Sequence, residues 1–244
     1  MKTLLAPASM NDVIRLLRAW RFWVLGALIG GLAGTAFYFV SPPDYRARAT
    51  VVVSFIMEKA WPNKPDNELF YYLERESRKV EEVAWSDATL QQVAGQTNLT
   101  VAELRSGKLE LSQPQDGGWH FYASDPSQKT ANELATAWAQ VFTAQVQQGI
   151  QDAVALDAAR QALARSPGDA KIQAQIKDLE AKSFAVTPEL QVSLAQSKDL
   201  ATTRKTGLGV YCLVGAGLFL LLAGLVILFI PNLWVFSMGD RKSA

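Results

Sequence analysis

The chain has 244 residues, of which 49% are hydrophobic and 19% charged, with one cysteine and one histidine. A single cysteine, Cys212, excludes a disulfide framework and a cysteine-based metal site. Residues 41–206 carry 18 Lys/Arg against 21 Asp/Glu, a net negative charge that gives no reason to expect a nucleic-acid partner.

The first predicted element is a short amphipathic helix within residues 1–21. A candidate cap at Asn11 or Asp12 precedes a mixed apolar and basic stretch, Val13-Ile-Arg-Leu-Leu-Arg18. A basic amphipathic helix lies on a membrane surface, with its arginines near anionic lipid headgroups. We therefore expect a cytoplasmic N-terminus that contacts membrane lipids.

Two uncharged apolar runs predict transmembrane helices near the two ends of the chain. Residues 22–40 just reach the roughly 20 residues that a spanning helix needs, and residues 207–230 end before Pro231. Basic residues precede the first run and follow the second, so the positive-inside rule predicts cytoplasmic termini, with a short tail over 231–244. We expect a multi-pass protein of the cytoplasmic (inner) membrane whose residues 41–206 form a periplasmic or extracellular domain.

A cleaved signal peptide is the competing interpretation of the first run. Its apolar core would be unusually long for a signal peptide, which needs only a short apolar region before its cleavage site. Ser41-Pro42-Pro43, which follows the run, does not resemble a small-x-small cleavage site. We therefore interpret residues 22–40 as an uncleaved membrane anchor.

Three glycines follow one another at four-residue spacing in the first run: Gly26, Gly30 and Gly34. Glycines at this spacing remove side chains from one helix face, so that another helix can approach closely in lipid. The partner would be the chain's own second helix or a neighbouring subunit. The alternative is that these glycines reflect only the general frequency of glycine in membrane helices.

The first part of the intervening region mixes strand and helix signals. Residues 45–54 follow two prolines and are rich in β-branched residues, which predicts a strand. Further signals predict helices over 67–83 and from Ser86 or Asp87 to about Gly95, a capping box at Thr100–Glu103, and a hairpin of 108–112 with 119–123 around a turn containing Asp116-Gly117-Gly118.

The second part is dominated by a helical hairpin over residues 127–184. Its first helix begins after Asp125-Pro126 and could run for nearly forty residues, with an apolar residue at every fourth position: Leu134, Trp138, Phe142, Val146, Ile150 and Val154. Ser166-Pro-Gly-Asp169 predicts the turn, and a shorter helix returns before a last strand at 189–195. The expected fold class is α+β, with two transmembrane helices flanking a membrane-proximal α/β domain and a long projecting helical arm.

The sequence offers little catalytic chemistry. It contains no phosphate-binding loop of the G-x-x-x-x-G-K-[ST] type, and His120 has no second histidine or thiol with which to form a metal site. The carboxylates are spaced as on solvated helix faces, although acids that meet only in space could still pair as in a glycosidase. We expect a protein that is not an enzyme and that needs neither a metal nor a cofactor.

Aromatic residues offer a weak binding hypothesis. Trp119, Tyr122 and Trp138 are candidates for contact with sugar rings or with another subunit, because flat aromatic faces stack on sugars. The competing interpretation is that rings on a strand or helix belong to the core.

In their order along the chain, these segments resemble the Wzz-type chain-length determinants, the polysaccharide co-polymerases. The resemblance covers most of the chain, although each motif alone is loose, and the order of the motifs between the two terminal runs carries it. The matching segments are Asp12-Val-Ile-Arg-Leu-Leu-Arg18, Pro43-x-Tyr45-x-Ala47-x-Ala49, Ser86 to Leu104, Phe121-Tyr-Ala-Ser-Asp-Pro126 and Ala131-Asn-Glu-Leu-Ala135.

Two departures from that family stand out. The family commonly has several prolines before its second span, whereas Pro188 stands alone here and residues 189–206 contain none. The returning helix is also short, as in a compact member. Some relatives carry a tyrosine kinase after the second span, and the fourteen residues over 231–244 resemble the kinase-free kind. Whether a separate kinase is a partner stays open.

The resemblance implies a non-enzymatic regulator of the chain length of a polysaccharide, such as O-antigen, capsule or exopolysaccharide. It further implies a homo-oligomer that acts beside an integral membrane polysaccharide polymerase and its lipid-linked glycan. The alternative from another class is a membrane-anchored extracytoplasmic sensor or adaptor. A cytoplasmic tail of fourteen residues leaves no room for an output module, so a sensor would have to signal through a separate partner.

Overall fold

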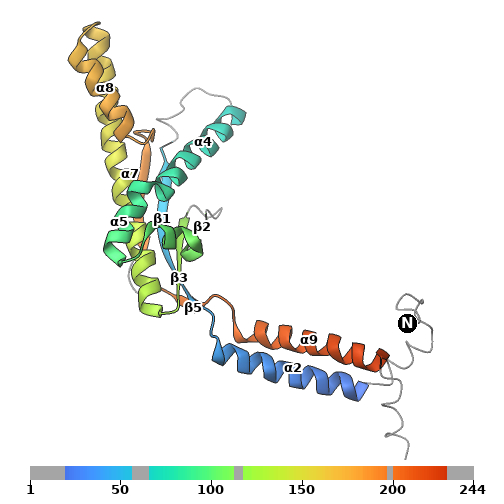
Figure 1. The fold of residues 1–244 in the computed structure, drawn as a ribbon. Helices are drawn as coiled ribbons and strands as arrows, with labels where there is room; N and C mark the ends of the chain where they lie inside the picture. Colours follow the sequence, from blue (N-terminus) through green and yellow to red (C-terminus); the bar gives the residue numbers. More distant parts are fainter. Residues whose placement is uncertain (1–19, 57–65, 113–117, 197–199, 230–244) are drawn as a thin grey trace, which may run out of the picture. The chain divides into compact units, whose positions relative to one another are not determined.

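The computed structural model describes residues 20–56, 66–112, 118–196 and 200–229 (Figure 1). The fold is α+β with one antiparallel sheet, as the sequence predicts. Two compact units divide the described chain at Pro43/Asp44 and Lys205/Thr206: a pair of apolar helices, and a domain over Asp44–Lys205. The predicted amphipathic N-terminal helix and the tail 231–244 lie outside the described residues.

The helix pair consists of α2 (Trp20–Val40) and α9 (Leu208–Phe229). Both helices are long and apolar enough to cross a membrane, which confirms the two predicted candidate spans near the chain ends. Of the most apolar stretch of each helix, only 11% and 6% is buried, unlike the core helix of a soluble protein. Neither helix differs from its predicted range by more than two residues at an end.

The sheet is built around β1 (Tyr45–Phe55). Its order is β2-β3-β1-β4. β4 pairs with the second half of β1, and β5 pairs with the start of β1. The other strands are β2 (Leu109–Ser112), β3 (Gly118–Asp125), β4 (Leu190–Gln196) and β5 (Thr202–Arg204). The β2–β3 pairing confirms the predicted hairpin, while most of its turn, residues 113–117, lies outside the described residues.

The domain begins and ends in one antiparallel strand pair. Tyr45 of β1 lies opposite Arg204 of β5, and the Lys205 N–H donates to the Asp44 carbonyl at 2.9 Å. The Arg204 guanidinium lies 4.0 Å from the centre of the Tyr45 ring and donates to its hydroxyl at 2.9 Å. β5 was not predicted, because three residues with no alternating pattern do not stand out as a strand.

Between β1 and β2 the described residues form the helices α4 (Asp66–Trp85) and α5 (Asp87–Thr97) and the single turn α6 (Val101–Glu103). The Ser86 hydroxyl caps α5 by accepting from the Thr89 N–H. Both halves of the predicted capping box at Thr100 and Glu103 are present. A wide turn over Leu104–Lys108 then leads into β2.

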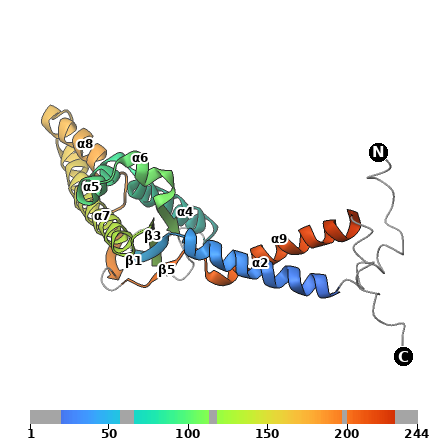
Figure 2. The same cartoon turned by 60° about the horizontal axis from the view of Figure 1, so that its bottom comes forward.

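The longest element is α7 (Gln128–Arg165, 38 residues), which packs against β1, β3 and β4 and then extends beyond the sheet. The shorter α8 (Ala170–Lys182) returns along it, and the two helices lie side by side (Figure 2). Between the two helices a second, smaller core forms from Leu156, Ala159 and Leu179.

The predicted apolar stripe of α7 leaves the core before it ends. Each step of four residues advances about 40° around a helix of 3.6 residues per turn. Of the residues in this stripe, Ile150 is half-buried and Val154 is 54% exposed, whereas the four before them are buried: Leu134, Trp138, Phe142 and Val146. Beyond the sheet, Ala153 and Leu156 take over the buried side of the helix, and Leu156 belongs to the small core shared with α8.

Candidate functional site

The contact between α2 and α9 depends on backbone-to-backbone packing at two of the predicted glycines. A Cβ atom on Gly30 would lie 2.7 Å from the Phe219 Cβ, and one on Gly34 would lie 2.8 Å from the Tyr211 carbonyl carbon. Real Cβ contacts are not this short, so neither position has room for a side chain. At Gly26 a Cβ would make an ordinary contact with Ala223 at 3.4 Å.

The second helix contributes a glycine that the sequence analysis missed. A Cβ on Gly215 would lie 3.0 Å from the Gly34 Cα, so the two glycines meet where the helix backbones approach each other. The glycines of α9 at 209, 215, 217 and 224 form no four-residue series, which is why no sequence pattern marked this face. Within the described chain, the glycine face of α2 lies against the chain's own second helix.

Polar and aromatic groups add to this contact. The Thr35 hydroxyl donates to the Gly31 carbonyl at 2.8 Å and lies 3.0 Å from the Cys212 sulfur. The Tyr211 ring lies 5.4 Å from the Tyr38 ring in an edge-to-face arrangement. In hydrocarbon, small residues and short interhelical hydrogen bonds are the interactions that hold helices together.

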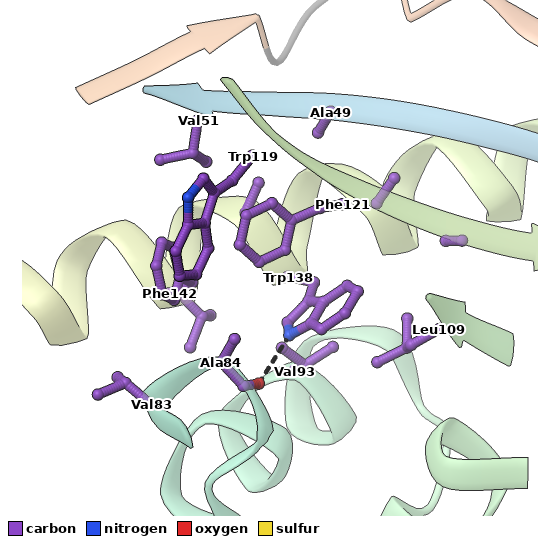
Figure 3. Packing of buried hydrophobic residues seen from close by; sticks show 14 of the residues in the cluster. Ala49, Val51, Val83, Ala84, Val93, Leu109, Trp119, Phe121, Trp138 and Phe142 are labelled. Atoms are coloured by element: carbon purple, nitrogen blue, oxygen red, sulfur yellow. Dashed lines mark hydrogen bonds between the residues drawn. The ribbon is translucent and has the colours of Figure 1, made fainter. Parts of the chain in front are cut away.

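Trp138 lies in the centre of the domain core and cannot reach a ligand or a second subunit (Figure 3). Its side chain has no exposed surface, and its indole N–H donates to the Ala84 carbonyl at 3.0 Å. The centre of its ring lies 4.9 Å from the centre of the Trp85 ring and 4.8 Å from that of the Phe121 ring. The predicted sugar or subunit contact at Trp138 is therefore corrected to a role in the core.

The same correction applies to Trp119. Odd-numbered residues of β3 point toward α7, because side chains alternate along a strand, and Trp119 stacks at 5.8 Å on Phe142 of that helix. Its side chain is buried (Figure 3). The sequence pattern showed the alternation but could not show which face of the strand α7 covers.

Tyr122 lies on the opposite face of β3 and is only half-buried. The Arg46 guanidinium lies 3.7 Å from the centre of its ring and also forms a 2.8 Å ion pair with Glu110 of β2. His120 meets the Tyr122 ring edge-on at 6.0 Å, and its Nδ1 lies 3.2 Å from the Thr50 hydroxyl. Of the three candidate aromatic residues, only Tyr122 is at the surface, and Arg46 covers one face of its ring.

A partly buried ion pair fixes the junction between β3 and α7. The Lys108 ammonium donates to the Asp125 carboxylate at 2.8 Å, and the same carboxylate accepts from the Ser127 N–H at 2.9 Å. Burial by itself raises the pKa of Asp125, but the hydrogen bonds from Lys108 and Ser127 and the charge of Lys108 outweigh it. The pKa of Asp125 therefore lies below its ordinary value of 3.8.

Replacing Asp125 by asparagine is expected to lower the free energy of unfolding by about 1–3 kcal/mol at neutral pH, because the charge of the partly buried Lys108 loses its partner. A lowered folded-state pKa means that the contribution of the pair is present above pH 3.8 and is lost as the pH falls through that lowered pKa. The variant should lack this acid-induced loss. Urea denaturation over a pH series measures both effects.

Asp87→Asn is the matched control for this variant, because Asp87 pairs with Arg105 at the surface and its side chain is 72% exposed. Exposed pairs contribute about 0–1 kcal/mol. Equal destabilisation by the two substitutions would contradict a special role for Asp125.

The described residues contain no cluster of three or more His, Cys, Asp or Glu side chains that could hold a metal ion. Comparison with protein-family models gives no match for this chain, and comparison with curated proteins gives none either. The features available for a functional interpretation are therefore the helix pair, the sheet surfaces and the helical hairpin.

Proposed function

We propose that this chain is a non-enzymatic regulator of polysaccharide chain length that acts as a homo-oligomer in the cytoplasmic (inner) membrane. Its partner would be an integral membrane polymerase that extends a lipid-linked glycan. In this proposal both termini are cytoplasmic, and residues Asp44–Lys205 form the periplasmic or extracellular domain.

The observation that supports the proposal most is the combination of two apolar helices with the long hairpin. Candidate membrane-spanning helices occur at both ends of the described chain, and the domain between them carries the 38-residue α7 with α8 packed along it. The part of α7 beyond the sheet leaves apolar side chains such as Val154 exposed, at 54%. In the proposed oligomer these side chains would contact a neighbouring subunit. Side-by-side packing of such hairpins around an axis would give a ring.

Deletion of the gene tests the proposal directly. The lengths of the surface polysaccharide chains are compared by gel electrophoresis in the deletion strain and in the strain complemented with the intact gene. We expect deletion to broaden or shift the length distribution and complementation to restore it. A distribution that deletion leaves unchanged would refute the proposed function.

The mass of the solubilised protein tests the oligomeric part. In mild detergent, light scattering should give a mass several times that of the single 26.7 kDa chain. A monomer or dimer would contradict the ring and favour a sensor or adaptor.

A further inference from the structure

A shallow groove lies along the free edge of β4, where α7 passes beside the sheet. It has a volume of about 490 Å³ and is lined by residues of β1, α7 and β4. This volume falls within the roughly 300–1,000 Å³ typical of sites for small ligands. The groove is separate from the α2–α9 contact and from the Lys108–Asp125 junction.

The lining of this groove combines polar and aliphatic residues and carries no charge. Ile150 contributes an aliphatic patch to the groove. The hydrogen-bonding side chains come from three elements and are those of Ser54, Gln147, Gln151, Gln191 and Ser193. None of the described residues that line the groove is charged. Amide and hydroxyl groups both donate and accept hydrogen bonds, so they suit a neutral ligand rich in hydroxyl groups.

The register of β4 determines which backbone groups face the groove. The Ile56 N–H donates to the Glu189 carbonyl at 3.0 Å, so residues 189, 191 and 193 direct their backbone groups to β1. Leu190 and Val192 therefore direct theirs away from the sheet, toward the free edge.

Two of these edge groups already have partners. The Leu190 N–H donates to the Thr187 carbonyl at 3.2 Å, and the Val192 carbonyl accepts from the Gln147 amide at 3.3 Å. A peptide that joined the sheet as a new strand would need such groups free. Strand addition here would have to break these two hydrogen bonds, whereas binding through the side chains beside the edge would leave them intact.

We propose that this groove binds a short, uncharged segment of a glycan, with Gln151 and Gln191 as hydrogen-bonding residues on opposite sides of it. This inference rests on the proposed function, because it assigns the place where the domain contacts the growing polysaccharide. The aliphatic surface of Ile150 would pack against the apolar face of a sugar ring.

The test uses the full-length chain in detergent and oligosaccharides prepared by partial hydrolysis of the polysaccharide from the producing cell. Anion exchange separates uncharged from charged fragments, and calorimetry measures the affinity for each. We expect saturable binding of the uncharged fragments. A double variant, Gln151→Leu with Gln191→Leu, should bind about tenfold more weakly. Leucine is similar in volume to glutamine but lacks its hydrogen-bonding amide.

Gln161→Leu is the matched control, because Gln161 is exposed on the same helix and lies outside the groove. It should bind as the unmodified chain does. Absence of binding by the unmodified chain, or equal affinity in the double variant and the control, would overturn the proposal.

Chain-length analysis separates this inference from the proposed function. Suppose that deletion alters the length distribution, and that the double variant is still oligomeric, restores the distribution fully and binds the fragments normally. The assignment of the groove as the glycan site is then wrong, and the proposed function stands. If deletion alters nothing, the proposed function itself fails.

Discussion

Gly34→Leu is expected to separate α2 from α9 and abolish their close contact. A side chain at this position would enter space occupied by the α9 backbone, since even a Cβ would lie 2.8 Å from the Tyr211 carbonyl carbon. Backbone atoms cannot move aside as a flexible side chain can, so the helices themselves must shift. Overpacking typically costs about 1–3 kcal/mol, and here it also removes the contacts of the neighbouring Gly30.

A disulfide crosslink reports this contact. Thr35 lies 3.0 Å from the sulfur of the single cysteine, Cys212, so a Thr35→Cys chain should crosslink within itself when membranes are oxidised. After cleavage in the intervening domain, the disulfide should keep the two fragments together on a non-reducing gel. A crosslink between two chains would instead give a full-length dimer before cleavage.

Gly31→Leu provides the control for Gly34→Leu, because a Cβ on Gly31 meets nothing within 4 Å. In the Thr35→Cys background we expect this control to crosslink as efficiently as the parent chain, and Gly34→Leu to crosslink far less. Equal crosslinking in all three chains would show that the helices do not pack through this face.

Trp138→Ala is expected to lower the free energy of unfolding of the domain by about 3–5 kcal/mol. The indole is fully buried, and its removal leaves a cavity among Trp85, Phe121 and Phe142. The Ala84 carbonyl also loses the hydrogen bond from the indole N–H. A loss of this size is a large fraction of the stability of an ordinary domain, about 5–15 kcal/mol.

Trp138→Phe separates the two contributions. It keeps a ring in the core but removes the hydrogen-bond donor, so it should destabilise the domain less than the alanine variant does. Urea denaturation of the full chain, followed by the fluorescence of the remaining tryptophans, gives the free energies. A cost below about 1 kcal/mol for the alanine variant would contradict the central position of this residue.

Local signals allowed most elements of the fold to be predicted. Ser86 and the Thr100–Glu103 box cap helices through residues only three positions apart, so the sequence contains all partners of each interaction. The start of α7 after Asp125-Pro126 is likewise a local feature. What could not be predicted depends on distant partners: the β5 strand exists only because it pairs with β1.

The candidate site residues show the same limit. The glycine spacing on α2 marked a packing face, but only the structure shows that Gly215 lies opposite it. The sequence could not show that Trp138 is buried while Tyr122 lies at the surface. An apolar residue at every fourth position of a helix, or an alternating pattern in a strand, defines a face but does not show what covers it. The groove beside β4 brings together Ser54, Gln151 and Gln191, which are far apart in the chain and belong to no motif.

The pairing of Tyr45 with Arg204, and of Asp44 with Lys205, makes the domain an insertion with adjacent ends. Domains whose ends lie close together are the ones that tolerate exchange and transplantation. Residues Asp44–Lys205 could therefore be replaced by another folded module with neighbouring termini without lengthening the connection between the two helices. Because the ends of the domain are adjacent, the helix pair could hold a different domain of this kind in the same way.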